Sequence, residues 1–201
     1  MRHRIYNLMK RMDIKDLNTQ LALQCTPVIT GLKVANLLIL QNNKVEYLKR
    51  IIGETRLLYF VFFQSECKTI ILLYNKSLLQ SYLSKKQVRV FLERMGYELL
   101  DLNDILSQLQ FRYEAYKIGL QEFPHEIGLI LGYPLEDVEG FIKNQGQNSL
   151  YTGYWKVYDH LPEKMHLFSE FELAEETILR QVLNGVNMIA IINSNFVDQI
   201  T

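Results

Sequence analysis

The sequence FPHEIGLILGYPLEDVEGF, residues 123–141, organises the expected fold, because apolar spacing and helix-ending residues coincide in it. Pro124 suits the first turn of a helix, since its φ is fixed near the helical value and its missing N–H needs no partner there. Ile127 and Ile130 follow at helical spacing, and Gly132 is typical of the position after a helix end. We predict a short helix that begins at Pro124 and ends before Gly132.

A second helix is predicted to begin at Pro134, with Glu136 and Asp137 near the positive end of its dipole. Two short helices joined by a turn are also the framework of DNA-binding helix-turn-helix proteins. The charges argue against that function, because the second helix starts with acidic residues and offers only Lys143 near its end. A helix that meets phosphate groups needs positive charge. We therefore expect no nucleic-acid partner.

His125 and Glu126 are candidate catalytic residues at the start of the first helix. The positive end of a helix dipole favours a neutral imidazole, which can act as a base or as a ligand. In the alternative interpretation, Glu126 serves the helix start and His125 hydrogen-bonds a neighbouring loop. The pair is not part of an H-E-x-x-H motif, so the sequence predicts no metal site here.

The composition is that of an ordinary globular protein with balanced charge. Its 22 acidic and 22 basic residues give no overall field that favours nucleic acid or an anionic membrane. Two cysteines do not make a disulfide framework and are expected to be reduced thiols in a cytoplasm. No apolar run approaches the roughly 18 residues that span a bilayer. Residues 1–12 are expected to be a short amphipathic helix or a frayed tail.

Two apolar runs predict a strand pair at the centre of a sheet. Residues 57–63 and 68–74 are apolar at nearly every position and are separated by a gap the size of a turn, which favours an antiparallel hairpin buried on both faces. The alternating sequence of residues 151–158 predicts a third strand, and residues 186–192 a fourth.

The remaining periodic segments predict seven or eight helices that cover this sheet. Thr26 and Pro27 are typical of a helix start, which predicts a helix over residues 28–38. The other helices are expected at residues 14–23, 45–52, 77–83, 87–95, 102–117 and 162–183. Strands and helices do not alternate regularly, so the expected class is α+β, with residues 1–201 as a single domain.

Cys25 is a third candidate catalytic residue, because it precedes the helix predicted to begin at Pro27. A helix N-terminus lowers the pKa of a thiol, and His125 as base would complete a nucleophilic pair. The alternative is a small buried thiol in the core, which is a common environment for cysteine.

Three cations occur in otherwise apolar or aromatic segments, where a charge needs a partner: Lys33, Arg112 and Lys156. They are candidates to bind a small anionic ligand, with Tyr133 and Trp155 as pocket walls. Ion pairing with Glu126 or Asp137 is the alternative.

Three segments, CTPVITGLKVANLL, FPHEIGLILGYPLEDVEGFI and GYWKVY, together resemble a bacterial family of domains of unknown function. The resemblance runs in order from about Cys25 to Phe168, and its most specific part is FPHEIGxxLGYPxxDVxGF followed by GxWKVY. The family pattern also contains cysteines around the last segment and after the next helix, and this chain lacks them. The resemblance implies a shared fold and a shared site around His125, Glu126 and Lys156. It implies no reaction and no cofactor.

Two functions remain open on the sequence. The first is a cytoplasmic ligand-binding or enzyme-like domain, with its polar site between the FPHEIG helix start and the GYWKVY strand. The second is a protein-protein interaction module without catalysis, which would show an exposed apolar patch instead of a concave polar pocket.

Overall fold

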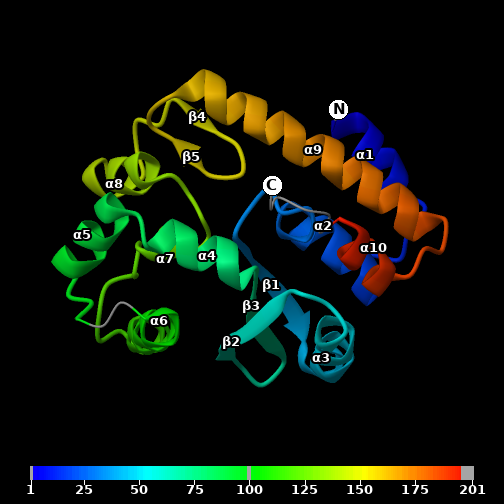
Figure 1. Cartoon of the computed structure of the whole chain (residues 1–201), viewed down its shortest axis with the longest axis horizontal. Helices are drawn as coiled ribbons and strands as arrows, with labels where there is room; N and C mark the ends of the chain where they lie inside the picture. Colours follow the sequence, from blue (N-terminus) through cyan, green and yellow to red (C-terminus); the bar gives the residue numbers. More distant parts are fainter. Residues whose placement is uncertain (1, 99–100, 196–201) are drawn as a thin grey trace. The chain divides into compact units, whose positions relative to one another are not determined.

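A computed structural model describes residues 2–98 and 101–195 (Figure 1). These residues form ten α-helices, one 3-10 helix and five strands, arranged as an antiparallel three-stranded sheet and an antiparallel two-stranded hairpin. The predicted α+β class is confirmed. The described part of the chain has five strands where about four were expected, because several segments adopt a different structure from the predicted one.

The described residues divide into two compact units. Unit 1 contains the residues up to Lys76 together with those from Met165 onward, and unit 2 is Ser77–Lys164. The expectation of a single domain stays a prediction. No helix within residues 2–98 and 101–195 is long and apolar enough to cross a membrane.

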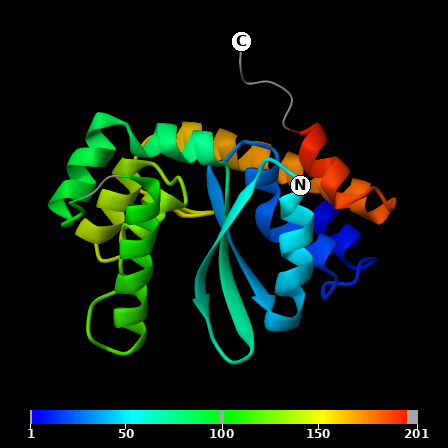
Figure 2. The ribbon, with the colours of Figure 1, turned by 60° about the horizontal axis from the view of Figure 1, so that its bottom comes forward.

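The sheet of unit 1 has the strand order β1-β3-β2 (Figure 2). Its strands are β1 (Ala35–Gln41), β2 (Leu58–Gln64) and β3 (Lys68–Tyr74). The predicted antiparallel hairpin of residues 57–63 and 68–74 is confirmed as β2 and β3. The expectation that both are central is wrong, since β1 pairs with the other side of β3 and leaves β2 at the edge. Leu58 and Tyr59 of β2 are consequently exposed.

Helix α2 (Leu17–Ile29) continues through Pro27, where the sequence predicted a new helix to begin. Proline removes one backbone donor, but burial of Cys25 and its apolar neighbours in the core compensates for that loss. The predicted helix over residues 28–38 is wrong. Gly31 has a φ of 71° and ends the helix, and the chain then enters β1.

The hydrophobic core of unit 1 lies between the inner face of the sheet and five helices. These are α1 (Arg2–Met9), α2, α3 (Val45–Gly53), the C-terminal part of α9 (Leu161–Leu183) and α10 (Met188–Ser194). A 3-10 turn, Asn42–Lys44, joins β1 to α3. The strand predicted at residues 186–192 is wrong. Asn187 instead caps α10 by accepting a 2.8 Å hydrogen bond from the Ile189 N–H.

Most of unit 2 is helical. Its helices are α4 (Lys76–Leu83), α5 (Lys86–Arg94), α6 (Leu102–Lys117), α7 (Ile127–Ile130) and α8 (Leu135–Lys143). The predicted pair of short helices around Gly132 is confirmed as α7 and α8, and Gly132 has a φ of 72°. Helix α7 starts later than predicted, so His125 lies in the turn before it rather than in its first turn.

The single strand predicted at residues 151–158 is wrong. The chain reverses there and forms the hairpin β4 (Tyr151–Thr152) and β5 (Lys156–Val157). The Gly153 N–H donates to the Trp155 carbonyl at 3.0 Å and closes the turn. Trp155 therefore lies at the tip of a hairpin, where its side chain is positioned against α8.

Candidate functional site

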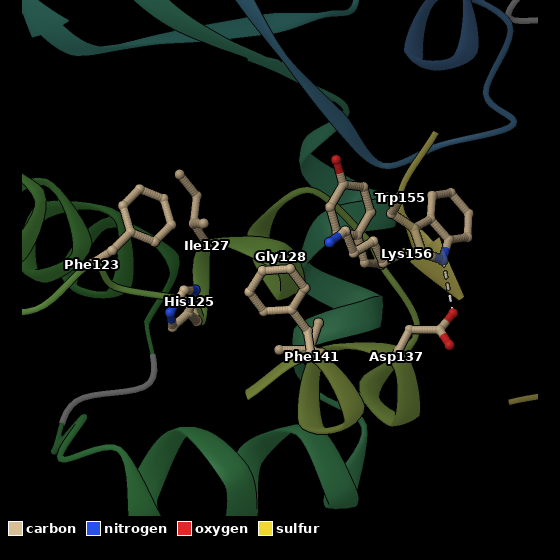
Figure 3. Close-up of a pocket in the computed structure, with 10 residues that line it drawn as sticks. Phe123, His125, Ile127, Gly128, Asp137, Phe141, Trp155 and Lys156 are labelled. Carbon is tan, nitrogen blue, oxygen red and sulfur yellow. Dashed lines mark hydrogen bonds between the residues drawn. The ribbon is translucent and has the colours of Figure 1, made fainter. Parts of the chain in front are cut away.

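Unit 2 contains a cavity of about 290 Å³ between the α7–α8 pair and the β4–β5 hairpin (Figure 3). Its wall is mainly apolar and aromatic, and it is lined by Phe123, His125, Ile127, Gly128, Tyr133, Asp137, Val138, Phe141, Trp155 and Lys156. Figure 3 shows Phe123 and His125 on one side of the cavity, with Trp155 and Lys156 on the other. Four of the eight predicted site residues meet here: His125, Tyr133, Trp155 and Lys156.

The close approach of α7 and α8 depends on Gly128. A Cβ atom at this position would lie 2.8 Å from Val138 Cγ2 and 3.2 Å from the Tyr133 ring. The Tyr133 N–H donates to the Gly128 carbonyl at 2.8 Å, which fixes the turn between the two helices. The absence of a side chain at Gly128 thus lets the tyrosine and valine reach the cavity wall.

Asp137 attaches the hairpin to α8. Its Oδ2 accepts a 2.7 Å hydrogen bond from Trp155 Nε1, and its Oδ1 accepts from the backbone N–H groups of Tyr158 at 2.7 Å and Asp159 at 3.3 Å. The side chain is almost fully buried. A buried carboxylate needs such donors, because desolvation of an unpaired charge is costly. Both oxygens of Asp137 are therefore used in hydrogen bonds that hold Trp155 and the residues after it in place.

The Trp155 indole is also one face of the cavity. It stacks on Tyr133 with the ring centroids 5.0 Å apart and the planes inclined by 27°. Tyr82 supports the other partner by donating its hydroxyl to the Tyr133 carbonyl at 2.6 Å. The result is a rigid aromatic surface of the kind that binds planar or apolar groups.

His125 is part of a row of rings that continues to the opposite wall. Its imidazole lies 5.2 Å from the Phe123 ring and 5.1 Å from the Phe141 ring, measured between centroids. The histidine is exposed, whereas both phenylalanines are half-buried. His125 thus stands at the rim of the cavity, where a ligand can reach it.

Lys156 brings a positive charge to the cavity. Its Nζ donates to the Gly146 carbonyl at 2.5 Å and lies 5.8 Å from the centroid of the Phe141 ring. Gly146 follows the C-terminal end of α8 and has a φ of 72°. Carbonyl groups near a helix C-terminus attract cations, so the ammonium group is held where α8 favours it.

Glu126 does not line the cavity. It also makes no side-chain hydrogen bond that caps α7, although the alternative interpretation expected it to serve the helix start. Its Oε1 pairs with Arg112 Nη1 at 2.9 Å and accepts from the Tyr97 hydroxyl at 3.1 Å. Arg112 also donates to the Met95 carbonyl at 2.6 Å and lies 4.6 Å from the Tyr97 ring. Burial and the adjacent Glu126 carboxylate raise the pKa of Tyr97. Glu126 and Arg112 thus form a buried structural ion pair.

Cys25 and Lys33 belong to unit 1, whereas His125 belongs to unit 2. Cys25 lies inside α2, not ahead of a helix start, and is fully buried. Burial raises the pKa of its thiol to about 12, and burial lowers the pKa of the nearby Lys33 to about 8. The expected activation of the thiol by a helix N-terminus therefore does not apply. The proposed pairing of Cys25 with His125 stays a prediction.

Asp137, Phe123 and Phe141 line the cavity but were not among the predicted site residues. The acidic first turn of α8 was visible in the sequence, yet a carboxylate there is usually explained by the helix dipole. Only the reversal of the chain at Gly153 brings Trp155 back to Asp137. In the described ranges no group of three or more His, Cys, Asp or Glu side chains is arranged to hold a metal ion.

The described residues have an α+β architecture, and unit 2 contains an aromatic pocket. Residues 21–192 match the family described as "Protein of unknown function (DUF3793)", and the chain belongs to that family. The family expected from the sequence, one without an assigned function, is thereby confirmed. No curated protein and no solved structure matches the chain. The function therefore has to be inferred from the site itself.

Proposed function

We propose that unit 2 binds a small molecule in the cavity between α7, α8 and the β4–β5 hairpin. The observation that carries this proposal is the cavity of about 290 Å³ with aromatic walls and Lys156 in its lining. Small-molecule sites are concave and mostly apolar, with a few polar groups that fix the orientation of the ligand. A volume near 300 Å³ is at the small end of such sites, which favours a compact ligand.

The arrangement favours binding over catalysis. A general base needs a partner that orients it, and a carboxylate is the usual partner of histidine. Two carboxylates near His125 have other roles, since the adjacent Glu126 pairs with Arg112, and Asp137, which lines the same cavity, holds the hairpin. We propose that His125 contacts the ligand at the rim of the cavity.

Both cysteines of the described chain are free thiols, Cys25 buried and Cys67 exposed. An exposed free thiol favours a reducing compartment, because it would otherwise be oxidised. We therefore propose that the protein acts in a cytoplasm.

Trp155 makes the binding proposal directly testable, because it is the only tryptophan of the chain. A ¹⁵N-labelled sample gives a single indole cross-peak, and this peak belongs to a residue of the cavity wall. We expect several members of a library of small aromatic fragments to shift the peak at millimolar concentration or below. If none of them shifts it, the proposal is wrong.

A matched pair of variants locates the binding. Phe141→Ala removes part of the cavity wall, whereas Phe111→Ala removes a ring that is 66% exposed and lies outside the cavity. Fragment affinity should fall about tenfold or more in Phe141→Ala, since an aromatic contact and its buried area are lost. It should be unchanged in Phe111→Ala. Equal affinities in both variants would place binding elsewhere.

A protein-protein interaction module is the alternative function, favoured by exposed apolar residues at the C-terminal end of α6 and in the loop after it. Ile118 and Leu120, which follow α6, are exposed by 73% and 74%, and Phe111 of α6 is exposed by 66%. Large apolar side chains with such exposure are typical of protein contacts when they gather in one place. We take a second copy of the chain as the partner, because self-association can be measured with the purified protein alone.

The alternative predicts a concentration-dependent mass in light scattering or native mass spectrometry. Replacing Ile118 and Leu120 by serine should then abolish the association without lowering the thermal stability. A monomeric mass at every concentration up to the millimolar range excludes self-association through this patch.

A further inference from the structure

The electrostatic environment of the cavity indicates which chemical group its ligand carries. Four titratable side chains line it: His125, Tyr133, Asp137 and Lys156. Both carboxylate oxygens of Asp137 already accept hydrogen bonds from the protein. An ammonium group has three N–H donors, and the contact of Lys156 with the Gly146 carbonyl uses one of them. Lys156 is therefore the group in this lining best suited to bind an anion.

We propose that the ligand is an apolar monocarboxylate, whose carboxylate is bound by Lys156 and whose hydrocarbon or aromatic body lies against Trp155, Tyr133 and Phe141. This inference rests on the proposed function and specifies the class of ligand. It follows from the charge and the shape of the wall taken together.

The position of the Lys156 ammonium group is fixed by its neighbours. It donates a hydrogen bond to the Gly146 carbonyl beyond the C-terminal end of α8. The face of the Phe141 ring adds a favourable cation–π interaction at 5.8 Å. The Phe141 ring also packs closely on Gly146, where a Cβ atom would lie 3.0 Å from the ring. The ring, the carbonyl and the ammonium group thus form one fixed arrangement.

A single negative charge fits this lining better than a phosphate does. Phosphate sites use arginine forks, glycine-rich loops or the start of a helix. Arg112 is committed to Glu126 and the Met95 carbonyl, and α7 is only four residues long. The Asp137 carboxylate in the same wall would repel a dianion more strongly than a monoanion. The single positive charge of Lys156 matches the single negative charge of a ligand carboxylate.

The rest of the cavity wall favours a ligand with an apolar body. Trp155 and Tyr133 present a stacked pair of rings, and Phe141 and Phe123 add two more. A hydrophilic acid such as acetate would leave this surface against water and gain little from it. An aromatic ring or a branched hydrocarbon chain on the ligand would bury this apolar surface.

The test uses two probes with the same phenylpropyl skeleton, the anion 3-phenylpropionate and the neutral alcohol 3-phenylpropan-1-ol, with the Trp155 indole cross-peak of the full-length protein as readout. The acid should bind the unaltered protein about tenfold or more tightly than the alcohol, because a charge-assisted hydrogen bond is available only to the acid. Lys156→Met, which preserves the side-chain length, should abolish this preference. Lys143→Met, a lysine of α8 outside the cavity, should keep it.

The outcomes separate the two proposals. If acid and alcohol bind equally well, the cavity is a ligand site but the carboxylate inference is overturned. Retention of the preference in Lys156→Met also overturns it, as does tighter binding of phenyl phosphate than of the acid. If neither these probes nor any library fragment shifts the peak, both proposals are wrong. A well-dispersed spectrum of each variant shows that the fold is intact.

Discussion

At the scale of single residues, Asp137 connects α8 to the β4–β5 hairpin and the residues after it. It is exposed by only 2%, and its carboxylate accepts three hydrogen bonds from residues 155–159. The hairpin is too short to be stable by itself, since an isolated two-stranded hairpin is marginal in water. The position of Trp155, and with it one wall of the cavity, therefore depends on this carboxylate.

Asp137→Ala should destabilise the protein by about 3 kcal/mol, because it leaves the buried indole N–H and two backbone N–H groups without an acceptor. The indole cross-peak of Trp155 should move upfield as its hydrogen bond is lost. Urea unfolding and the ¹⁵N spectrum measure the two effects. Glu139→Ala on the exposed face of α8 is the control and should cost less than about 1 kcal/mol. Equal costs in both variants would contradict the role of Asp137.

Cys25 and Lys33 predict how stability depends on pH. Burial lowers the pKa of Lys33 from 10.5 to about 8, so between these values the unfolded chain holds a proton that the folded chain lacks. Stability from Lys33 should therefore rise as the pH increases above 8. Burial raises the pKa of Cys25 from 9.0 to about 12, so its contribution falls with pH, but only above 9.

Between pH 8 and 9 the contribution of Lys33 to stability therefore changes, whereas that of Cys25 changes only above pH 9. The free energy of unfolding should rise in this window by more in the unaltered protein than in Lys33→Met, as measured by urea titration at about pH 7.5 and about pH 9. Parallel pH profiles for the two proteins would show that the lysine is not desolvated in the folded state.

At the scale of helices and strands, the sequence was most informative where one periodicity was present. The segments around Val45, Gln87 and Leu102 have clear helical spacing and form α3, α5 and α6 as predicted. The helix predicted at residues 28–38 was based on the start signal of Thr26 and Pro27, and the strand predicted at residues 186–192 on a short apolar run, in which a strand and a buried helix look alike. Tertiary burial then decided which structure formed.

The candidate site was likewise predictable only where the sequence carries a local pattern. The sequence predicted that His125, Tyr133, Trp155 and Lys156 share a site, because two unusual segments carry them. Ion pairing with Glu126 was the alternative stated for Arg112, and the structure contains that pair, but the sequence did not decide between the two, since ion pairs between distant segments leave no local pattern. The contact of Asp137 with Trp155 was hidden for the same reason.

The packing of α8 against the residues after the hairpin depends on Gly140, which makes it the element-scale test. A Cβ atom at Gly140 would lie 2.5 Å from Tyr158 Cβ, a distance that requires the chain to move. Gly140→Ala should therefore lower the melting temperature by several degrees, as expected for a loss of about 1–3 kcal/mol. Gly53→Ala in the last turn of α3 is the matched control.

A Cβ atom at Gly53 would meet no other atom within 4 Å, and the residue does not have a positive φ. Alanine there should be neutral or should stabilise the protein by up to about 1 kcal/mol, through the lower entropy of the unfolded chain. Scanning calorimetry measures both variants. If Gly140→Ala is as harmless as Gly53→Ala, α8 and Tyr158 are not in close contact.

At the scale of the whole molecule, the two units differ in how the chain builds them. Unit 2 is one continuous segment, Ser77–Lys164, whereas unit 1 combines residues from both sides of it. Helix α10 contributes Met188, Ile191 and Ile192 to the same core as α2 and α3. Unit 1 can therefore be complete only after the chain has passed through unit 2.

This organisation predicts two regions of different stability, which hydrogen–deuterium exchange can resolve. Leu48→Ala, at a fully buried position of the unit 1 core, should cost about 2–5 kcal/mol and reduce protection in residues up to Lys76 and from Met165 onward. Asp137→Ala should instead reduce protection within Ser77–Lys164. If each substitution lowers protection evenly along the described chain, the two units unfold together. The molecule then behaves as the single cooperative domain that the sequence led us to expect.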